Sequence, residues 1–257
     1  MVPNDRNNGG KRVKSVQRAF DVIREIQGAG SVRIADLADG LEMPRSTAHV
    51  YLKTLESEGF VTHDDTGYRL SLRFLQTGVL ARHQYRIYST AKSEVDKLAE
   101  ATGEVANLGI EENGFRVILY QSEGSDAVYD NALTGEHSKM HLTALGKVLL
   151  AYQPSEYIDD IVDRRGLPAA TENSITEFED LIREFRTIEL QGYALEDEER
   201  RSGIRSIATP IIANGTLLGA LSLSGPKERL REQRIAEELL PELRNTTNII
   251  EVKHTYD

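Results

Sequence analysis

Two short helical patterns, separated by only three residues, dominate positions 34–59 of this 257-residue chain. The first runs over 34–40, and the second opens at Pro44, whose missing N–H costs nothing in the first turn of a helix. Gly59 ends the second pattern. The apolar residues expected to face inwards are Ile34, Leu37, Ala38, Ala48, Tyr51, Leu52 and Leu55. Two helices joined by so short a turn resemble a helix-turn-helix.

A further helix precedes this pair, and a hairpin follows it. Between Ser15 and Gln27, apolar residues recur at the spacing of one helix face, and Gly28 supplies a left-handed stop. The residues of that face are Val16, Ala19, Phe20, Ile23 and Ile26. Two strand-like segments, 60–63 and 68–71, then flank a polar turn. This order predicts a winged helix-turn-helix domain over residues 13–74.

The polar side of the predicted third helix suits DNA. Arg45 can bind a guanine edge or a phosphate, and the methyl groups of Val50 can touch a thymine methyl. The full set of candidate DNA-binding residues is Arg45, Ser46, Thr47, His49, Val50, Lys53 and Arg69. Residues 1–12 are expected to be a disordered basic arm that follows the DNA backbone or enters a minor groove; a merely solvated tail is the alternative. Winged helices also mediate protein–protein contacts, so that alternative stays open.

The charge is distributed unevenly. A net charge of -10 would argue against a nucleic-acid partner, but residues 1–83 hold 12 Lys+Arg and 10 Asp+Glu. Residues 84–257 hold 19 and 31, so the acidity belongs to the second part. Arg outnumbers Lys 22 to 9, and with the acidic balance this predicts a halophilic origin, where salt screens self-repulsion. A GC-rich genome is the other explanation of the Arg bias. The absence of Cys excludes disulfides and thiolate metal sites.

The second part is predicted to be an α+β domain. Residues 75–88 are expected to form a helical connector whose apolar side chains pack against a second copy of the chain; these are Leu75, Val79, Leu80, Tyr85 and Tyr88. Strands are expected at 105–110, 115–121, 127–133, 204–213 and 217–224. Helices are expected at 88–101, 141–152, 155–164, 175–191 and 227–252. An antiparallel sheet covered by helices over residues 89–257 can hold an internal pocket.

Three separated motifs of this chain closely resemble the IclR family of transcription regulators. They are Lys139 to Lys147 (KMHLTALGK), Gly192 to Ala208, and Ala220 to Pro226 (ALSLSGP). The head also matches, with Arg45-Ser46-Thr47 opening the recognition helix. The resemblance implies a winged-helix head and a GAF-like domain that binds a small organic molecule, often a carboxylate, in dimers or dimers of dimers. Many members have Arg where this chain has Val50, so the operator cannot be transferred.

Carried over by position, the resemblance implies an effector pocket lined by Met140, Thr143, Ala144, Leu145, Glu196, Ile204, Arg205 and Ser206. Physically, N–H groups at the start of the 141–152 helix, with Ser206 on a nearby strand, can receive a carboxylate. Glu196 would repel an anion unless it faces away or is protonated. A neutral or hydroxylated, sugar-derived ligand is therefore the alternative.

Other signals are discounted. Gly146-Lys147 is only half of a phosphate loop, and His137 with His141 lacks a third metal ligand, so neither a cofactor nor a metal is predicted. The acidic run 196–201 is interpreted as a solvated loop rather than a catalytic carboxylate pair. The first residues lack the apolar core of a secretory signal, and no run approaches the ~20 apolar residues that span a bilayer, so a cytoplasmic protein without membrane contact is expected.

Together these observations predict a ligand-responsive regulator, not an enzyme, that binds double-stranded operator DNA as a dimer or tetramer and senses a small organic metabolite. The alternative is a small-molecule sensor or enzyme whose winged helix mediates assembly.

Overall fold

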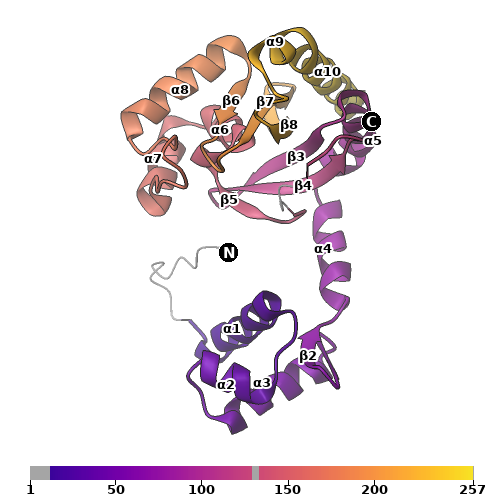
Figure 1. Cartoon of the computed structure of the whole chain (residues 1–257), viewed down its shortest axis with the longest axis vertical. Coiled ribbons are helices and arrows are strands. Elements are labelled where there is room, and N and C mark those ends of the chain that lie inside the picture. Colours follow the sequence, from indigo (N-terminus) through magenta and orange to yellow (C-terminus); the bar gives the residue numbers. More distant parts are fainter. Residues whose placement is uncertain (1–11, 129–132, 257) are drawn as a thin grey trace. The chain divides into compact units, whose positions relative to one another are not determined.

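The computed structural model describes residues 12–128 and 133–256, which divide between Gln84 and Tyr85 into two compact units. Figure 1 shows the elements of both units. Residues 1–11 of the predicted basic arm lie outside the described residues, as do 129–132. The units are taken in turn below.

The N-terminal unit is a winged helix-turn-helix, as predicted. Its elements are α1 (Lys14–Ala29), α2 (Ile34–Gly40), α3 (Arg45–Ser57), β1 (Val61–Asp64), β2 (Gly67–Leu70) and α4 (Arg73–His83). β1 and β2 pair antiparallel, and Val32 forms a bridge with Tyr68 that ties the hairpin to the start of α2. Val22, Ile26, Leu37 and Leu52 are fully buried between the helices. The apolar periodicity of the sequence therefore produces a small but closed core.

α1 differs from the prediction in two respects. It continues through Gly28 to Ala29 and is capped by Gly30, whose φ is 76° and whose N–H donates to Ile26 O. Its buried face is centred on Val22 and Ile26, whereas Val16 and Phe20 are 53% and 52% exposed. The helix carries two apolar stripes, and the core of this unit covers only one. The predicted inward positions Val16 and Phe20 are therefore wrong.

The C-terminal unit is a six-stranded antiparallel sheet with helices, which confirms the α+β class. The strand order is β5-β4-β3-β8-β7-β6. The strands are β3 (Val105–Glu112), β4 (Phe115–Glu123), β5 (His137–Lys139), β6 (Ala194–Asp197), β7 (Ile204–Ala213) and β8 (Thr216–Pro226). The helices are α5 (Arg86–Thr102), the 3-10 turn η1 (Met140–Leu142), α6 (Ala144–Ala151), α7 (Ser155–Arg165), α8 (Phe178–Gln191), α9 (Glu232–Arg234), the π-helical η2 (Ile235–Leu239) and α10 (Leu240–Tyr256).

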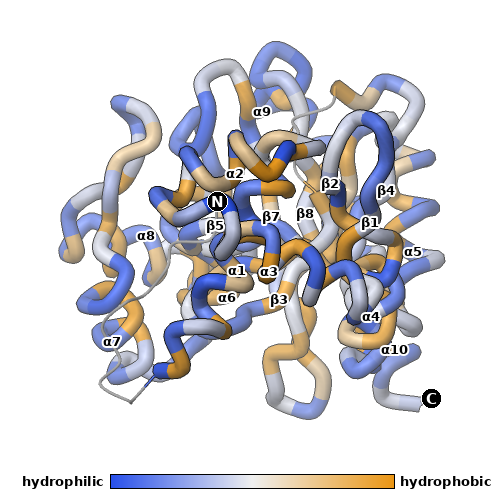
Figure 2. Tube along the Cα trace, turned by 90° about the horizontal axis from the view of Figure 1, so that it is seen from below, coloured by the Kyte–Doolittle hydropathy of each residue, from blue (hydrophilic) through white to orange (hydrophobic). Residues whose placement is uncertain are grey.

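The two faces of this sheet are covered by different helices. α5 and α10 cover one face, where aliphatic side chains of β3, β7 and β8 form the larger core. α6 lies against the other face with all eight of its residues buried, and α7 and α8 cover it in turn. Figure 2 shows the long hydrophilic stretches along α7 and α8, as expected for an outer layer. α6 is thus sandwiched between the sheet and these outer helices.

The helical connector predicted over 75–88 is interrupted. α4 ends at His83, and Tyr85 adopts an extended conformation before α5 begins at Arg86. The Tyr85 hydroxyl donates to Glu112 Oε1 at 2.8 Å, and Tyr88 is buried with its ring 5.8 Å from that of Tyr120. Because both tyrosines belong to the core of the C-terminal unit, the prediction that they pack against a second copy is wrong.

Four further boundaries differ from expectation. The strand predicted over 127–133 is absent at 127, 128 and 133, its other residues lie outside the described part, and the sheet edge is β5 instead. β6 was not predicted, because its four residues are too few to show a clear alternation. The helix predicted from His141 begins at Ala144, after a 3-10 turn. The helical C-terminal segment begins at Glu232 rather than Lys227.

Candidate DNA-binding face and effector cavity

The exposed side of α3 carries the predicted DNA-binding residues. Ala48 and Leu52 are fully buried, which turns the opposite side of the helix to solvent. The exposed α3 residues include Arg45, Ser46, Thr47, His49, Val50 and Lys53, and Arg69 is exposed on β2. Val50 is 62% exposed, so a methyl-bearing surface interrupts this polar face. The structure thus places all seven predicted residues on the solvent-facing surface of the unit.

Two of these cations have acidic neighbours. Lys53 Nζ lies 2.7 Å from Glu56 Oε2, and Arg69 Nε lies 3.4 Å from Asp64 Oδ2. The hydrogen bond from Lys53 lowers the pKa of Glu56, and the hydrogen bonds from Thr66 lower that of Asp64. Exposed ion pairs of this kind contribute little to stability, so both cations can exchange their acidic partners for phosphate oxygens.

The C-terminal unit has a small, partly open cavity of about 40 Å³ between the sheet and the start of α6. Five of the eight predicted effector residues line it: Thr143, Leu145, Glu196, Ile204 and Ser206. Seven lining residues were not predicted: Asn107, Arg116, Ile118, Arg200, Arg201, Ser222 and Ser224. A period-two pattern of polar residues inside otherwise apolar strands was the available signal, since Ser222 and Ser224 alternate with Leu221 and Leu223.

Three predicted pocket residues do not line this cavity. Met140 borders a separate space of about 10 Å³ beside Arg165, and Ala144 is fully buried in the apolar cluster around α6. Arg205 lies one position from Ser206 on β7, and side chains alternate between the faces of a strand. Its guanidinium therefore lies elsewhere, 2.7 Å from Asp197 Oδ2 and donating to Leu230 O at 2.9 Å.

The N-terminus of α6 is capped by the side chain of Thr143, the residue just before the helix. Gly146 N–H donates to Thr143 Oγ1 at 2.9 Å, so Thr143 satisfies one of the N–H groups expected to meet a carboxylate. The helix also begins three residues later than predicted, which places its first turn at Ala144 rather than His141. An anion at this point would compete with the Thr143 hydroxyl.

The acidic run 196–201 is not a solvated loop. Glu196 is 3% exposed and closes the turn after β6: its Oε1 accepts the N–H groups of Glu199 (2.8 Å) and Arg200 (3.2 Å). Its Oε2 accepts the Ser206 hydroxyl at 2.9 Å. Burial raises the pKa of Glu196. Both oxygens of the carboxyl group are therefore hydrogen-bonded to donors of the protein itself.

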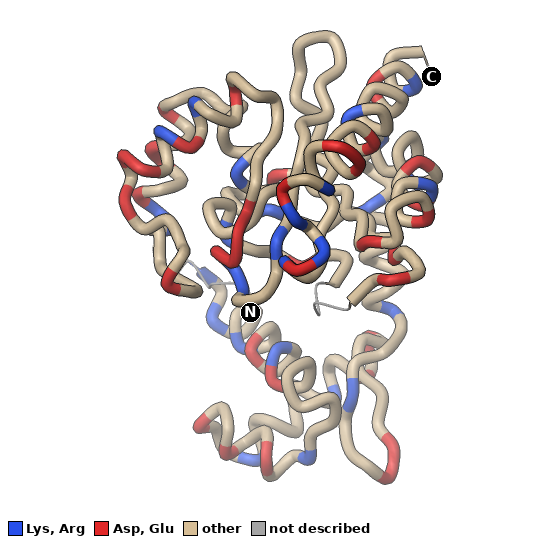
Figure 3. The backbone as a smooth tube through the Cα atoms, turned by 45° about the horizontal axis from the view of Figure 1, so that its top comes forward, with Lys and Arg blue, Asp and Glu red and all other residues tan. Residues whose placement is uncertain are grey.

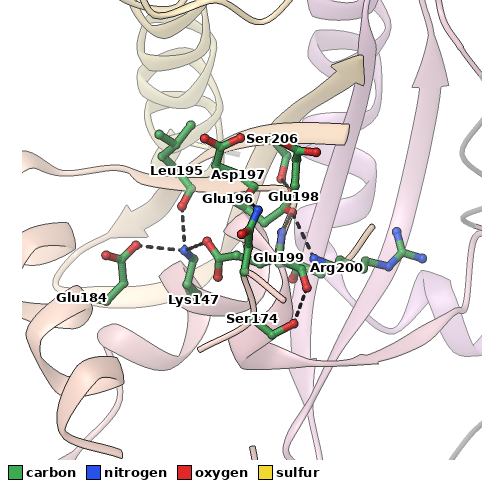
Figure 4. Close-up of polar contacts among 12 residues, drawn as sticks. Lys147, Ser174, Glu184, Leu195, Glu196, Asp197, Glu198, Glu199, Arg200 and Ser206 are labelled. Atoms are coloured by element: carbon green, nitrogen blue, oxygen red, sulfur yellow. Dashed lines mark hydrogen bonds and ion pairs between the residues drawn. The ribbon is translucent and has the colours of Figure 1, made fainter. Parts of the chain in front are cut away.

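Lys147 holds the same turn from α6 (Figure 4). It is 1% exposed, and its ammonium group contacts Glu199 Oε1 at 2.7 Å and Glu184 Oε1 at 2.9 Å. It also donates to Leu195 O at 2.6 Å, so each of its three protons has an acceptor. Ser174 Oγ donates to Glu199 O at 2.6 Å. Lys147, which the sequence shows beside Gly146 as half of a phosphate loop, is therefore a buried residue that holds the turn beside the cavity.

Cations form the other wall of the cavity. Arg116 on β4 is 2% exposed, and its Nη2 lies 3.4 Å from Glu136 Oε1, which Arg200 also approaches to 2.9 Å. Burial alone would raise the pKa of Glu136, but the Ser138 hydrogen bond and the two positive charges outweigh it and lower that pKa. One carboxylate is thus shared by two guanidinium groups.

The two histidines considered as a metal pair lie on different elements. His137 lies on β5, and its Nδ1 is 2.9 Å from Gly135 O. His141 lies in η1, and its Nε2 is 3.1 Å from Pro168 O, in the segment after α7. Burial lowers the pKa of His141. Within residues 12–128 and 133–256, no three His, Cys, Asp or Glu side chains are grouped to bind a metal.

A winged helix with an exposed recognition helix and a separate unit with a polar internal cavity together define a DNA-binding regulator with a ligand-binding domain. Comparisons with known proteins identify the kind. Residues 79–252 match the model described as "Bacterial transcriptional regulator IclR C-terminal", and residues 15–65 match "IclR helix-turn-helix domain". The chain belongs to the IclR family of transcriptional regulators, which are not enzymes.

Individual relatives agree over nearly the whole length. The probable HTH-type transcriptional regulator ArcR of Halobacterium salinarum is 32% identical, covering 98% of each chain. The crystal structure of the Thermotoga maritima IclR is 26% identical with a TM-score of 0.80, covering 94% of this chain and 99% of that one. An IclR homolog from Microbacterium hydrocarbonoxydans, crystallised with 4-hydroxybenzoate, is 21% identical with a TM-score of 0.79 and covers 93% and 98%. In the described residues, no helix is long and apolar enough to cross a membrane.

Proposed function

We propose that this protein binds operator DNA through α3 as a homodimer or dimer of dimers, and that a small organic effector in the cavity changes its DNA affinity. The observation that carries the proposal is the cavity itself. Asn107, Arg116 and Glu196 are buried around this space. Burying polar and charged groups is unfavourable unless they find hydrogen-bonding or charged partners, so a domain stabilised only by packing would have little reason to place them there. A relative of the same fold that binds 4-hydroxybenzoate supports the use of this domain for ligands.

Exposed apolar side chains of the N-terminal unit support a dimer. They lie at the start of α1 and of α4 and along both helices. They are Val13, Val16, Phe20, Leu72, Leu75 and Leu80, each more than half exposed. Burying such side chains against a second copy is favourable by about 25 cal/mol per Å². A dimer would present two α3 helices to a two-fold operator.

The mechanism we propose is thermodynamic linkage. An effector that binds one arrangement of the two α3 helices better than another shifts operator affinity by its differential binding free energy, typically ~1–3 kcal/mol. The N-terminal unit has few excess positive charges, and Figure 3 shows acidic residues spread along the helices of the C-terminal unit. In molar salt, such a protein would depend on base contacts and dimer geometry more than on counterion release.

The test is a gel-shift titration of the full chain with the promoters of its own and neighbouring operons, at its working salt and with competitor DNA. The variant Arg45→Ala should lower specific affinity about 5- to 150-fold, the range for one bidentate base contact. Arg24→Ala is the control, because Arg24 is also exposed but lies on α1, paired with Asp21. Both variants should unfold at the parent temperature. Absence of specific binding to every promoter, or equal affinity of parent and Arg45→Ala, contradicts the proposal.

A further inference from the structure

The C-terminal end of α3 is closed by a glycine turn. Gly59 has a φ of 78°, and its N–H donates to Glu56 O at 2.9 Å. Phe60 N–H donates to Leu55 O, also at 2.9 Å. This pair of hydrogen bonds is a Schellman motif, which satisfies carbonyl groups of the last helical turn. The carbonyl groups that follow, those of Glu58 and Gly59, need donors from elsewhere in the chain.

Those donors come from the residues that open α4. Arg73 Nη1 donates to Glu58 O at 2.8 Å, and Ser71 Oγ donates to Gly59 O at 2.5 Å. Ser71 Oγ also accepts Arg73 N–H at 3.2 Å, which joins the two donors to each other. A cation at the C-terminal end of a helix is favoured by the helix dipole as well. The start of α4 therefore completes the hydrogen bonding at the end of α3.

Aromatic contacts strengthen the same junction. The ring of Phe60 is 5.0 Å from the ring of Phe74 and 5.2 Å from the guanidinium carbon of Arg73. Both kinds of contact are favourable at these distances. A Cβ atom at Gly59 would lie only 3.0 Å from Arg73 Nη1, so the glycine leaves room for the guanidinium group. Arg73 thus contacts the end of α3 through both a backbone carbonyl and a ring.

α4 depends on this junction for its attachment to α3. All of α4 belongs to the described residues, and none of its residues is buried. Farther along the helix, Leu80 is 63% exposed. α4 is therefore held against α3 by the contacts of its first turn, and any tilt of α3 must break or stretch them.

Resting on the proposed reading of DNA by α3, we infer that Arg73 is a positioning residue for the recognition helix. It fixes the C-terminal end of α3 against the start of α4, and thereby sets the angle at which Arg45 meets the base edges. It acts on DNA through α3 and contacts no phosphate.

The length of α3 gives this contact its leverage. The helix has 13 residues that each rise about 1.5 Å, so Arg45 lies roughly 20 Å from the end that Arg73 holds. The buried side chains of Ala48 and Leu52 hold the middle of the helix in the core. A tilt about these two residues therefore moves both ends, and releasing the end at Glu58 also releases the end that reads bases.

Gel-shift titrations of the full chain at several salt concentrations test the inference, with a promoter that the parent binds and with unrelated DNA. Arg73→Met should lower promoter affinity about 3- to 10-fold, the change expected for one hydrogen bond. Affinity for unrelated DNA and the slope of log affinity against log salt should stay as in the parent. A lost phosphate contact would instead weaken binding to both DNAs and reduce the slope by about 1. Arg73→Lys should recover most of the promoter affinity, because an ammonium group can still donate to Glu58 O.

Phe74→Leu tests the junction without changing charge. It removes the ring contact with Phe60, so promoter affinity should fall while the salt slope stays unchanged. Arg24→Met is the matched control, because Arg24 is an exposed cation on α1 that pairs with Asp21, and it should change neither quantity. Urea unfolding of each variant shows that binding is measured on folded protein. If Arg73→Met fails to fold, Phe74→Leu carries the same comparison.

A double-mutant cycle separates positioning from an independent effect. Changes at sites this far apart normally add in free energy, so their factors in affinity multiply. If Arg73 works by placing Arg45, much of its effect disappears once Arg45 is gone. In an Arg45→Ala background, Arg73→Met should therefore weaken promoter binding by less than half the factor that it shows in the parent.

Three results overturn the inference: promoter affinity of Arg73→Met equal to that of the parent, equal weakening for promoter and unrelated DNA, or an effect that combines fully with that of Arg45→Ala. In each case the parent still binds its promoter, so the proposed function stands. Absence of specific binding by the parent chain contradicts the proposed function itself, and the inference falls with it.

Discussion

The two faces of the six-stranded sheet are made by the same strands but differ in what they bury. Towards α5 and α10 the side chains are aliphatic, with Leu108 and Leu221 directly opposed and fully buried. Towards α6, the neighbouring positions Asn107 and Ser222 are polar, and charged groups are buried with them. Because side chains alternate at every residue, one set of strands supplies a packed aliphatic core on one face and a polar cavity lining on the other.

The two faces therefore contribute to the free energy of folding in different ways. The α5/α10 face removes hydrocarbon from water, which is favourable at about 25 cal/mol per Å². The α6 face instead buries charged groups that need partners, and the best paired is Lys147, which contacts Glu184, Glu199 and Leu195 O. Removing hydrocarbon should therefore cost stability in proportion to the space left, whereas removing one charge should leave others unpaired.

The largest effect is expected from Lys147→Met. This change keeps much of the side-chain volume but leaves Glu199 buried without its cation, and breaking a buried pair in this way costs about 3–5 kcal/mol. Urea unfolding measures it. The double variant Lys147→Met/Glu199→Gln should recover part of the loss, because one orphaned charge is gone. Lys92→Met is the control, since Lys92 is half exposed beside Asp96 and its loss should change stability far less than the loss of Lys147. A Lys147 variant as stable as the Lys92 variant would contradict this account of the α6 face.

Leu221→Ala on the opposite face should cost about 3 kcal/mol, as is usual when a fully buried Leu leaves a cavity. Leu145→Ala is the matched change on the α6 face, where the side chain already borders a cavity. It should cost about 2 kcal/mol, the low end of the range, because fewer packing contacts are lost. Equal losses of unfolding free energy for the two variants would show that the faces are packed alike.

The same contrast explains what the sequence could predict. The winged helix depends on local signals, namely the apolar spacing around Leu37 and Leu52 and the three-residue turn, and it forms as predicted. The second apolar stripe of α1 was misplaced because periodicity alone cannot tell which stripe the core will cover. Residues on the aliphatic strand face also follow directly from alternation.

The cavity was only partly predictable. Family position identified Thr143, Glu196 and Ser206 as pocket residues. The run that contains Glu196 and Glu199 was still interpreted as a solvated loop, because the buried partner of Glu199 is Lys147, which lies 52 residues earlier in the chain. Arg116 was missed for the same reason. A single charged residue within an apolar strand gives no local sign of the distant partner that compensates for its loss of hydration.

A smaller effect should come from a buried pair of hydroxyl groups on the aliphatic face, Thr209 and Thr247. Thr247 Oγ1 donates to Leu243 O at 2.9 Å, so its 2.8 Å contact with Thr209 is donated by Thr209. Thr247→Val then leaves the Thr209 hydroxyl without an acceptor and should cost about 1–3 kcal/mol, whereas Thr209→Val should cost about 1 kcal/mol or less. The double variant should be closer to Thr209→Val than to Thr247→Val in urea unfolding. The reverse order would mean that the hydroxyl protons are arranged the other way.

The smallest effect concerns pH. Burial raises the pKa of Glu196, so the folded protein binds more protons than the unfolded chain as pH rises above the usual Glu value. Stability should therefore fall with rising pH in that window, and Glu196→Gln should flatten the fall. The lowered pKa of Glu136 acts in the opposite sense: its contribution is present above the usual Glu value and is lost as pH falls below it. Glu136→Gln should flatten that acid limb instead. Urea midpoints measured across both windows test the pair, and parallel curves for parent and both variants would mean that neither carboxyl group is perturbed by folding.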